Sequence, residues 1–494
     1  MRPREGDDAG TAAAKSACCR YRNGLKCRAA FKGDAVRSRS TENMTSGEKR
    51  AVVGLAGVYG FRMLGLFLIL PVFALFAEHL PGATPFLTGL AVGIYGLTQA
   101  LLQIPFGLLS DRIGRKPVIF GGLLLFALGS VIAALADDIW LVIVGRAIQG
   151  SGAIAAAVMA MAADLTREEH RTKAMATIGI TIGASFMLAM LAGPVLGRLV
   201  GVSGIFWVTA LLALLGIAVV ALIVPTPMHS SVHRDAESVP AMFRRVLRNA
   251  DLLRLDFGIF SLHLILTALF LAVPLILRDL GLAPVHHSML YLPVMLGSIA
   301  AMVPFIILAE RRGLMKQVFL GAVACLGVAQ LALGLFAGHF WGFVAALALF
   351  FTAFNLLEAT LPSLVSKVAP VEAKGTAMGV YSTSQFSGAF VGGLVGGWVH
   401  QHLGVTAVFE AGALAALIWL LLASGMRKPG RYTSRLVNVG AVRASGANDL
   451  VDRLRRVPGV IEAVVVVDEG VAYLKVDREC LDHVALDEIV TRPA

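Results

Sequence analysis

Long, nearly continuous runs of apolar residues, separated by short polar stretches, dominate the chain between residues 51 and 426. A helix needs about 20 consecutive apolar residues to cross the hydrocarbon core of a bilayer. The pattern therefore predicts an all-α membrane protein with twelve transmembrane helices. These are predicted at residues 51–78, 86–110, 117–136, 139–163, 173–199, 203–224, 255–278, 287–309, 316–337, 340–366, 375–400 and 405–426.

Composition supports lipid, rather than water, as the solvent around these segments. Hydrophobic residues make up 57% of the chain and charged residues only 15%, and the mean hydropathy is +0.76. Soluble proteins carry about 25% charged residues. So few charges could not cover an apolar core of this size, so we expect a polytopic membrane protein with the lipid bilayer as its surroundings.

The connections between the helices alternate between basic and nearly uncharged stretches. DRIGRK (111–116), ERRGLMK (310–316) and the long connection 225–251 carry Lys and Arg, whereas EHLPGATP (78–85) and GVSG (201–204) carry none. Short loops rich in Lys and Arg stay in the cytoplasm, which predicts that both termini are cytoplasmic. The formal net charge of +11 then comes mostly from the basic loops that set the membrane topology. Because the basic residues are spread over many loops, we expect no nucleic-acid partner.

The two halves of the chain share short sequence matches. Two pairs of stretches match at nearly the same offset: DRIGRK (111–116) with ERRGLMK (310–316), and RTKAMATIG (171–179) with KGTAMGVYS (374–382). They indicate two six-helix halves, residues 44–224 and 252–426, joined by a cytoplasmic connection at 225–251. Such repeats are typical of secondary transporters, which bind substrate between the halves near the membrane midplane.

Two motifs in the first half connect the chain with a known family. GLLSDRIGRK (107–116) is similar to the signature loop of the major facilitator superfamily, G-x-L-x-D-R-x-G-R-K, and GRAIQGSGAIAAA (145–157) resembles its fourth-helix motif. The resemblance covers about residues 44–426. It is strongest to the YajR-type drug efflux transporters, which carry an extra cytoplasmic ferredoxin-like domain. It implies secondary active transport in the bacterial cytoplasmic (inner) membrane, without identifying a substrate.

The signature loop is the first candidate site. Gly107 permits close approach of a neighbouring helix, Asp111 could face the positive N-terminus of a helix in the other half, and Arg115 could pair with Asp164. In the superfamily this loop latches the two halves while the transporter faces outward. The alternative is a turn that only fixes topology, which would not require the glycines and Asp111 in register. The predicted latch residues are Gly107, Asp111, Arg112, Gly114, Arg115, Lys116 and Asp164.

Polar residues inside the predicted helices form the second candidate site, for proton coupling or for lining a cavity. They are Arg62, Arg146, Gln149, His263, Asn355 and Glu358. Each is costly in lipid unless it faces a cavity or a partner. We interpret Glu358 as the only acidic residue well inside a helix, with Asn355 on the same face. A carboxyl in a desolvated cavity can bind a proton near neutral pH, so Glu358 is the candidate proton carrier.

Structural roles remain alternatives for three of these residues. Glu358 could instead be the ion-pair partner of buried Arg62. For Arg146 the family resemblance implies a role in proton coupling, but a structural ion pair is the alternative. His263 could titrate near neutral pH, or could be hydrogen-bonded across a helix interface.

The fifth predicted helix contains AGPVLG (192–197). Gly193, Pro194 and Gly197 predict a bend, because proline removes one backbone hydrogen bond and crowds the preceding turn. The stretch resembles the core of the antiporter motif of drug–proton exchangers, although Ala189 and Arg198 stand where that motif prefers glycine.

No motif in the sequence indicates catalysis. There is no nucleophile–base arrangement and no G-x-x-x-x-G-K loop, so we expect neither an enzyme nor an ATP-driven pump, and no cofactor. The prediction is a proton-coupled efflux transporter for small hydrophobic or cationic compounds, driven by the proton gradient. The alternative is a proton-coupled symporter or an exporter of a sugar or other metabolite on the same fold.

Both ends of the chain differ from the apolar body. Residues 427–432 form a linker to a domain at 433–494, where strands are predicted at 434–439, 462–468 and 471–477 and helices at 448–459 and 484–490. The order β-α-β-β-α resembles a ferredoxin-like domain with a weak or missing last strand. It lacks Cys-x-x-Cys, so we expect no metal and predict a role in regulation or self-association. Residues 1–43 are predicted to be a disordered or mis-assigned extension.

Overall fold

The structure is a computed structural model in which residues 44–226, 239–370, 373–427, 432–440, 446–467, 470–477 and 480–491 are described. They belong to two compact units, a helical unit within Met44–Gly430 and a small α+β unit from Tyr432 onward. The predictions for residues 1–43, for most of the linker 427–432 and for part of the connection 225–251 lie outside the described residues.

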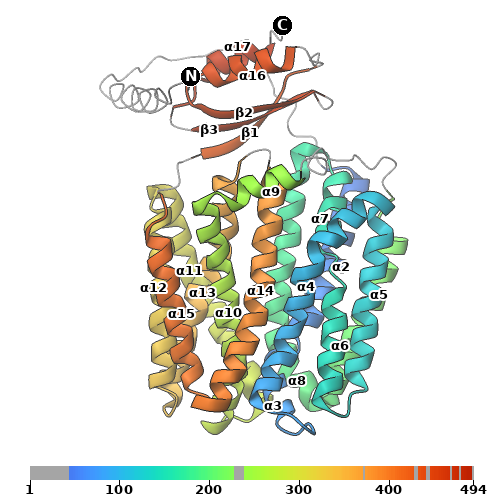
Figure 1. The fold of residues 1–494 in the computed structure, drawn as a ribbon, viewed down its shortest axis with the longest axis vertical. Coiled ribbons are helices and arrows are strands. Elements are labelled where there is room, and N and C mark those ends of the chain that lie inside the picture. The colour runs from blue at the N-terminus through green and yellow to red at the C-terminus, as the bar shows by residue number, and fades with distance from the viewer. Residues whose placement is uncertain are drawn as a thin grey trace, which may run out of the picture. The chain divides into compact units, whose positions relative to one another are not determined.

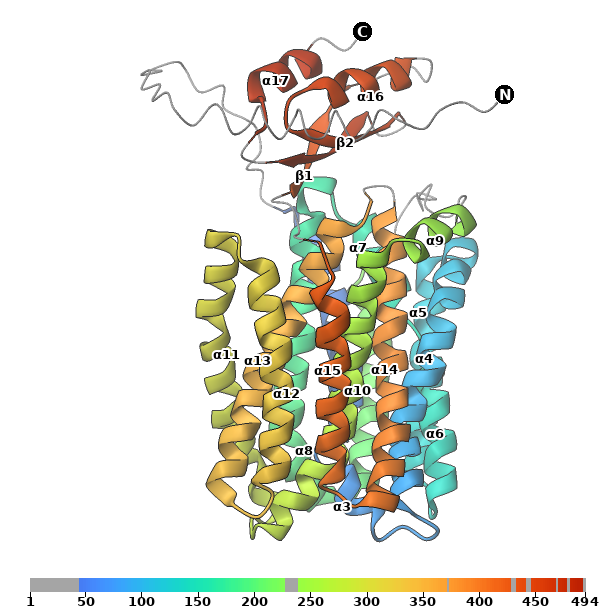
Figure 2. The same ribbon diagram turned by 60° about the vertical axis from the view of Figure 1, so that its left-hand side comes forward.

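The helical unit is a bundle of long helices lying side by side (Figures 1 and 2). Its first six-helix half contains α2 (Ser46–Phe67), α3 (Phe73–Ala77), α4 (Pro85–Ile113), α5 (Arg115–Ala134), α6 (Ile139–Ser151), α7 (Ala155–Asp164) and α8 (Glu168–Leu222). The short α9 (Val239–Leu247) precedes the second half. That half contains α10 (Ala250–Asp279), the 3-10 turn η3 (Pro284–His286), α11 (His287–Arg312), α12 (Met315–Leu335), α13 (Phe340–Val368), α14 (Lys374–Leu403) and α15 (Ala407–Ser424).

The twelve predicted transmembrane helices are all present, although they are divided differently. Ten helices among the described residues are long and apolar enough to cross a membrane. One of them, α8, has 55 residues. It would be about 80 Å long if straight, against a hydrocarbon core of about 30 Å. Its backbone leaves helical geometry at Gly201, with φ 69°, so α8 supplies the predicted fifth and sixth helices. The glycine-rich α14 is the predicted eleventh.

Two predicted helices are interrupted. The first stops at Phe67 and resumes at Phe73, because Pro71 lies in between and cannot donate a backbone hydrogen bond. The fourth is divided between α6 and α7 at Gly152. A Cβ atom at Gly152 would lie 2.2 Å from the carbonyl oxygen of Gly122 in α5, so this break lies where two backbones touch.

The small unit has the predicted order of elements. It consists of β1 (Tyr432–Asn438), α16 (Ala447–Arg456), β2 (Val460–Val466), β3 (Val471–Asp477) and α17 (His483–Thr491). The three described strands form an antiparallel sheet in the order β1-β3-β2. Leu454 of α16, Leu474 of β3 and Leu486 of α17 are fully buried in its core. The β-α-β-β-α prediction is confirmed.

Candidate functional site

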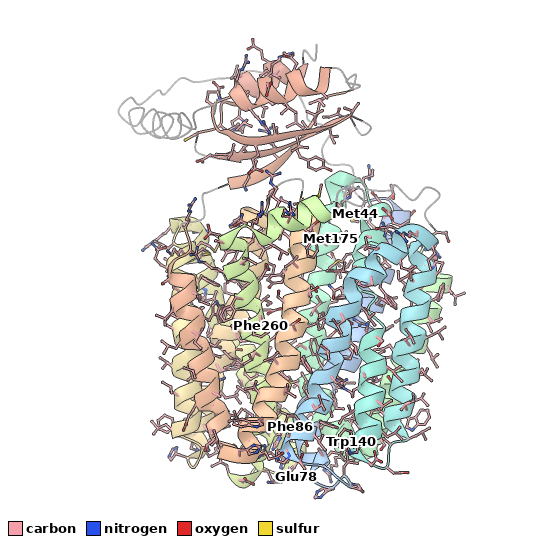
Figure 3. The ribbon with its side chains drawn as sticks, viewed as in Figure 1. Met44, Glu78, Phe86, Trp140, Met175 and Phe260 are labelled. Carbon is pink, nitrogen blue, oxygen red and sulfur yellow. The ribbon has the colours of Figure 1, made fainter. Side chains whose placement is uncertain are left out.

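The two ends of the helical bundle can be told apart by labelled residues. Figure 3 shows Glu78, Phe86 and Trp140 at one end, and Met44 and Met175 at the other. We call them the Glu78 end and the Met44 end. The predicted orientation places the Met44 end, where the signature loop lies, at the cytoplasmic face.

Polar contacts join the two halves at the Glu78 end. Glu78, which follows α3, forms an ion pair with Arg278 near the end of α10. The backbone N–H of Phe86, at the start of α4, donates to Gln401 Oε1 near the end of α14 at 3.2 Å. Both contacts connect a residue of the first half with a residue of the second.

Glycines allow α4 and α14 to touch backbone to backbone along this seam. A Cβ atom at Gly89 would lie 2.1 Å from the oxygen of Gly393, and one at Gly93 would lie 2.8 Å from the oxygen of Phe390. Small residues permit such close approach between membrane helices. Together with the polar contacts, this packing joins the two halves at the Glu78 end.

Arg115 is the centre of the signature loop. Its guanidinium donates to Asp111 Oδ1, to Ser110 Oγ at 2.7 Å and, through Nε, to Asp164 Oδ2 at 3.2 Å. Gly114, with φ 98°, makes the turn from α4 into α5. The structure therefore brings Asp111, Arg115 and Asp164 together, and all three belong to the first half. Their function as a latch stays a prediction.

The other predicted latch residues also make contacts within the first half. Lys116 Nζ donates to the carbonyl oxygen of Val224 at 2.7 Å, at the end of the sixth transmembrane segment. A Cβ atom at Gly107 would lie 3.2 Å from that of Ala156 in α7, which supports the predicted close approach. Arg112 is exposed.

Two buried arginines flank the ring of Tyr95 in the first half. The guanidinium carbon of Arg146 lies 5.0 Å from the ring centroid, and that of Arg62 lies 5.8 Å from it. Arg62 Nη2 donates to Gln99 Oε1, and Gln99 Nε2 donates to Gln103 Oε1 at 3.2 Å. Nε and Nη1 of Arg62 have no hydrogen-bond partner.

Arg146 binds neutral oxygens in place of the carboxylate that a structural ion pair would need. Its Nη1 donates to Gln149 Oε1 at 2.9 Å, and its other nitrogens donate to the backbone oxygens of Ala91 and Val92, both at 3.4 Å. Gln149 Nε2 in turn donates to Ser130 Oγ at 2.7 Å. The predicted motif residues Arg146 and Gln149 therefore tie α6 to α4 and α5.

A polar cluster in the second half surrounds Glu358. Gln385 Nε2 lies 3.5 Å from Glu358 Oε1 and 2.8 Å from His263 Nε2, linking α13, α14 and α10. The second carboxylate oxygen of Glu358 has no hydrogen-bond partner. The alternative ion pair with Arg62 is not formed, since Arg62 binds Gln99. Asn355, on the same face as Glu358, donates to Ser298 Oγ at 3.1 Å.

Sequence reasoning missed Gln385 and Asp256. A glutamine in a glycine- and serine-rich helix gave no signal of its contacts. Asp256 lies near the start of α10, is only 5% exposed, and neither of its carboxylate oxygens has a hydrogen-bond partner. Asp256 lies near the helix start, so it does not contradict the prediction that Glu358 is the only acidic residue well inside a helix. Its burial had only a weak signal in the sequence, because Arg254 interrupts the apolar residues before it.

The glycines of the fifth helix face the break in the first one. A Cβ atom at Gly193 would lie 2.7 Å from Pro71 Cγ and 2.8 Å from the oxygen of Leu68, and one at Gly197 would lie 3.4 Å from Val72 Cγ1. The helix continues through Pro194, and its backbone leaves helical geometry at Gly201 instead. These glycines therefore accommodate the interrupted first helix.

No group of three or more His, Cys, Asp or Glu placed to hold a metal ion occurs in the part of the chain that the structure describes.

Comparison with known proteins agrees with this architecture. The sequence profile described as Major Facilitator Superfamily matches residues 55–307 and 255–441. The chain is 48% identical over 448 residues to the inner membrane transport protein YajR of Escherichia coli (strain K12), covering 90% of this chain and 98% of that protein. It is 24% identical over 352 residues to the multidrug resistance protein MdtH of Yersinia pestis (strain Pestoides F), covering 69% and 84% respectively.

A solved structure shares the fold. The human organic anion transporter MFSD10 (TETRAN) superposes with a TM-score of 0.58 at 20% identity, covering 77% of this chain and all of that one. The profile match, the close relative and the bundle of two six-helix halves lead to one conclusion: the chain belongs to the Major Facilitator Superfamily of transporters.

Proposed function

We propose that this protein exports small hydrophobic compounds across the bacterial inner membrane in exchange for protons, by alternating access. The observation that carries the proposal is Glu358, a carboxyl inside the bundle that has no ion pair and contacts Gln385, which also contacts His263. The relatives support the proposed membrane and the proposed kind of transport, since one is an inner membrane transport protein and another a multidrug resistance protein.

A proton on Glu358 would make the movement between states less costly. A carboxylate is expensive in a low-dielectric interior, and protonation removes its charge. We propose that Glu358 takes up a proton from the periplasm and releases it to the cytoplasm after the halves have moved. Gln385 would stabilise the carboxyl group by hydrogen bonding to it, and His263 would hold Gln385 in place.

The contacts at the two ends of the bundle support alternating access. In the predicted orientation the Glu78–Arg278 ion pair and the glycine seam close the periplasmic side. The signature loop at the opposite end is held within the first half, through Asp111, Arg115 and Asp164. We propose that this loop engages the second half when the Glu78 end separates.

Inside-out membrane vesicles with an acidified interior test this function. The neutral fluorescent dye N-phenyl-1-naphthylamine should accumulate in them, and a protonophore should abolish the accumulation. Glu358→Gln should remove at least nine-tenths of the proton-driven rate, because an amide cannot carry the proton. Glu410→Gln, which changes an exposed carboxyl at the start of α15, should transport normally.

Two outcomes would contradict the proposal. A normal pH-dependent rate in Glu358→Gln would leave this carboxyl a structural role only. Proton-driven movement of the dye out of the inside-out vesicles would indicate a symporter, the alternative that the sequence left open.

A further inference from the structure

Arg62 is a buried cation that the protein itself satisfies only in part. Its side chain is among the largest fully buried ones, with 1% of the residue exposed. One nitrogen, Nη2, donates to the neutral oxygen of Gln99, while Nε and Nη1 have no hydrogen-bond partner. A guanidinium carries five N–H donors and no acceptor, and a buried charge is strongly unfavourable unless it is paired.

The described residues around Arg62 add further donors and no negative charge. Tyr95, whose ring lies against Arg62, has a buried hydroxyl that interacts with Arg62 but forms no hydrogen bond of ordinary geometry. Arg146 lies against the same ring. The buried carboxylates Glu48 and Asp164 of the first half are both paired with arginines near the ends of their helices, Glu48 with Arg167. Among the described residues, the two cations at the centre of the first half therefore have no carboxylate partner.

This group of donors lies next to the seam between the two halves. The ring of Tyr95 is 6.4 Å from that of Phe386 in α14, centroid to centroid, and a Cβ atom at the neighbouring Gly96 would lie 2.5 Å from the oxygen of Phe386. Secondary transporters bind their substrates at this interface, near the midplane. Phe126 places its ring 5.6 Å from the Arg62 guanidinium and 6.4 Å from the ring of Tyr95, centroid to centroid.

We propose that Arg62 binds a carboxylate or sulfonate group of an aromatic substrate, with the Tyr95 hydroxyl as a second donor. The planar fork of arginine matches the two oxygens of such a group, and the rings of Tyr95 and Phe126 provide an apolar surface beside it. This inference rests on the proposed transport function, and by assigning a negative charge to the substrate it departs from the sequence prediction of hydrophobic or cationic compounds.

A matched pair of ligands tests the assignment directly. Binding of 2-naphthoate and of 2-naphthamide, which has the same ring system without the charge, is measured on the purified full chain in detergent by calorimetry. We expect 2-naphthoate to bind at least about tenfold more tightly, because a hydrogen bond to a charged group is worth more than a neutral one. Arg62→Gln should abolish this preference, and Tyr95→Phe should weaken 2-naphthoate binding by about twofold to tenfold.

Two further variants separate charge recognition from folding. Arg62→Lys keeps the charge without the planar fork, so it should keep a reduced preference for 2-naphthoate. Arg312→Gln, which removes an exposed arginine at the end of α11, should bind as the unchanged protein does. If Arg62→Gln does not fold, Tyr95→Phe and Arg62→Lys still decide the matter.

The proposal is overturned if 2-naphthoate does not bind, if the two ligands bind equally, or if Arg62→Gln retains the preference. These measurements use no proton gradient, so they do not depend on whether transport is proton-coupled. Failure of dye accumulation in vesicles with intact 2-naphthoate binding would contradict the transport mechanism alone. Loss of the ligand preference with intact accumulation would contradict the anion site alone.

Discussion

Two carboxyl groups inside the second half, Glu358 and Asp256, differ in what surrounds them. Glu358 contacts Gln385, whereas neither oxygen of Asp256 has a hydrogen-bond partner. A buried carboxylate without a partner destabilises the folded state, because it loses its hydration without gaining an equivalent interaction. Such groups are retained where function requires them, often at the expense of stability.

Asp256→Asn should therefore raise the free energy of unfolding, by about 1 kcal/mol or more, since a neutral amide of the same size is less costly to bury. Thermal unfolding of the purified protein in detergent measures the change. Asp251→Asn is the control, because it removes a partly exposed ion pair with Arg254 and should give no gain in stability. A lower melting temperature for Asp256→Asn would show that the native structure relies on the charge.

At the scale of helices, the sequence predicts what depends on local composition. Each transmembrane helix needs its own apolar run, so the number and order of helices could be predicted. The interruption at Gly152 could not, because it depends on backbone contact with a neighbouring helix. Pro71 indicated a possible break after Phe67, but a proline alone does not decide, since α4 continues through Pro105. The same holds for the candidate site. Helical spacing places Asn355 and Glu358 on one face, but the contact of Glu358 with Gln385 depends on how α13 and α14 pack.

The glycine seam between α4 and α14 should control which end of the bundle is closed. Gly89→Val would place atoms where the oxygen of Gly393 lies, 2.1 Å from the position of Cβ. Since backbone cannot yield as a side chain does, the variant should favour states separated at the Glu78 end. A cysteine replacing Phe86, in a background without native cysteines, should then react several-fold faster with a membrane-impermeant maleimide.

Gly121→Val is the control for this experiment, because no atom lies within 4 Å of a Cβ at Gly121. It should leave the labelling rate unchanged. Equal rates in Gly89→Val and the unchanged protein would mean that the seam does not move during transport.

Variants of the signature loop should have the opposite effect on labelling at the Glu78 end. Arg115→Ala removes the donor that connects Asp111 and Asp164, and Asp111→Asn removes one of its two charged acceptors. Both variants should still insert into the membrane but should lower the population of the outward-facing state, which the latch is predicted to stabilise. Labelling of the Phe86 cysteine should fall, and labelling of a cysteine at the Met44 end should rise. Unchanged labelling at both ends in both variants would leave the loop with a topological role only.

At the scale of the whole molecule, the chain combines two units of different chemistry. The helical unit has few charges inside and many exposed apolar side chains on its lipid-facing surface, such as Leu222 and Leu335, each 78% exposed. The small unit instead has its own core of alternating strand residues and two helices. Because each unit has its own core, we expect each to fold by itself.

Truncation after Lys428 should therefore leave a folded membrane protein with residual transport but with altered regulation or self-association. We expect transport to need only the helical unit, because the polar residues around Arg62 and Glu358 lie within it, while a domain of the size of the small unit is only marginally stable alone. Leu474→Ala, at a fully buried position of β3, should act like a partial truncation, since emptying such a site costs about 2–5 kcal/mol. Val484→Ala, at a position 76% exposed, is its matched control.

Dye transport in vesicles and the mass of the purified particle by light scattering measure the effects. Loss of folded protein on truncation would contradict independent folding of the helical unit, and an unchanged rate and mass would show that the small unit is passive.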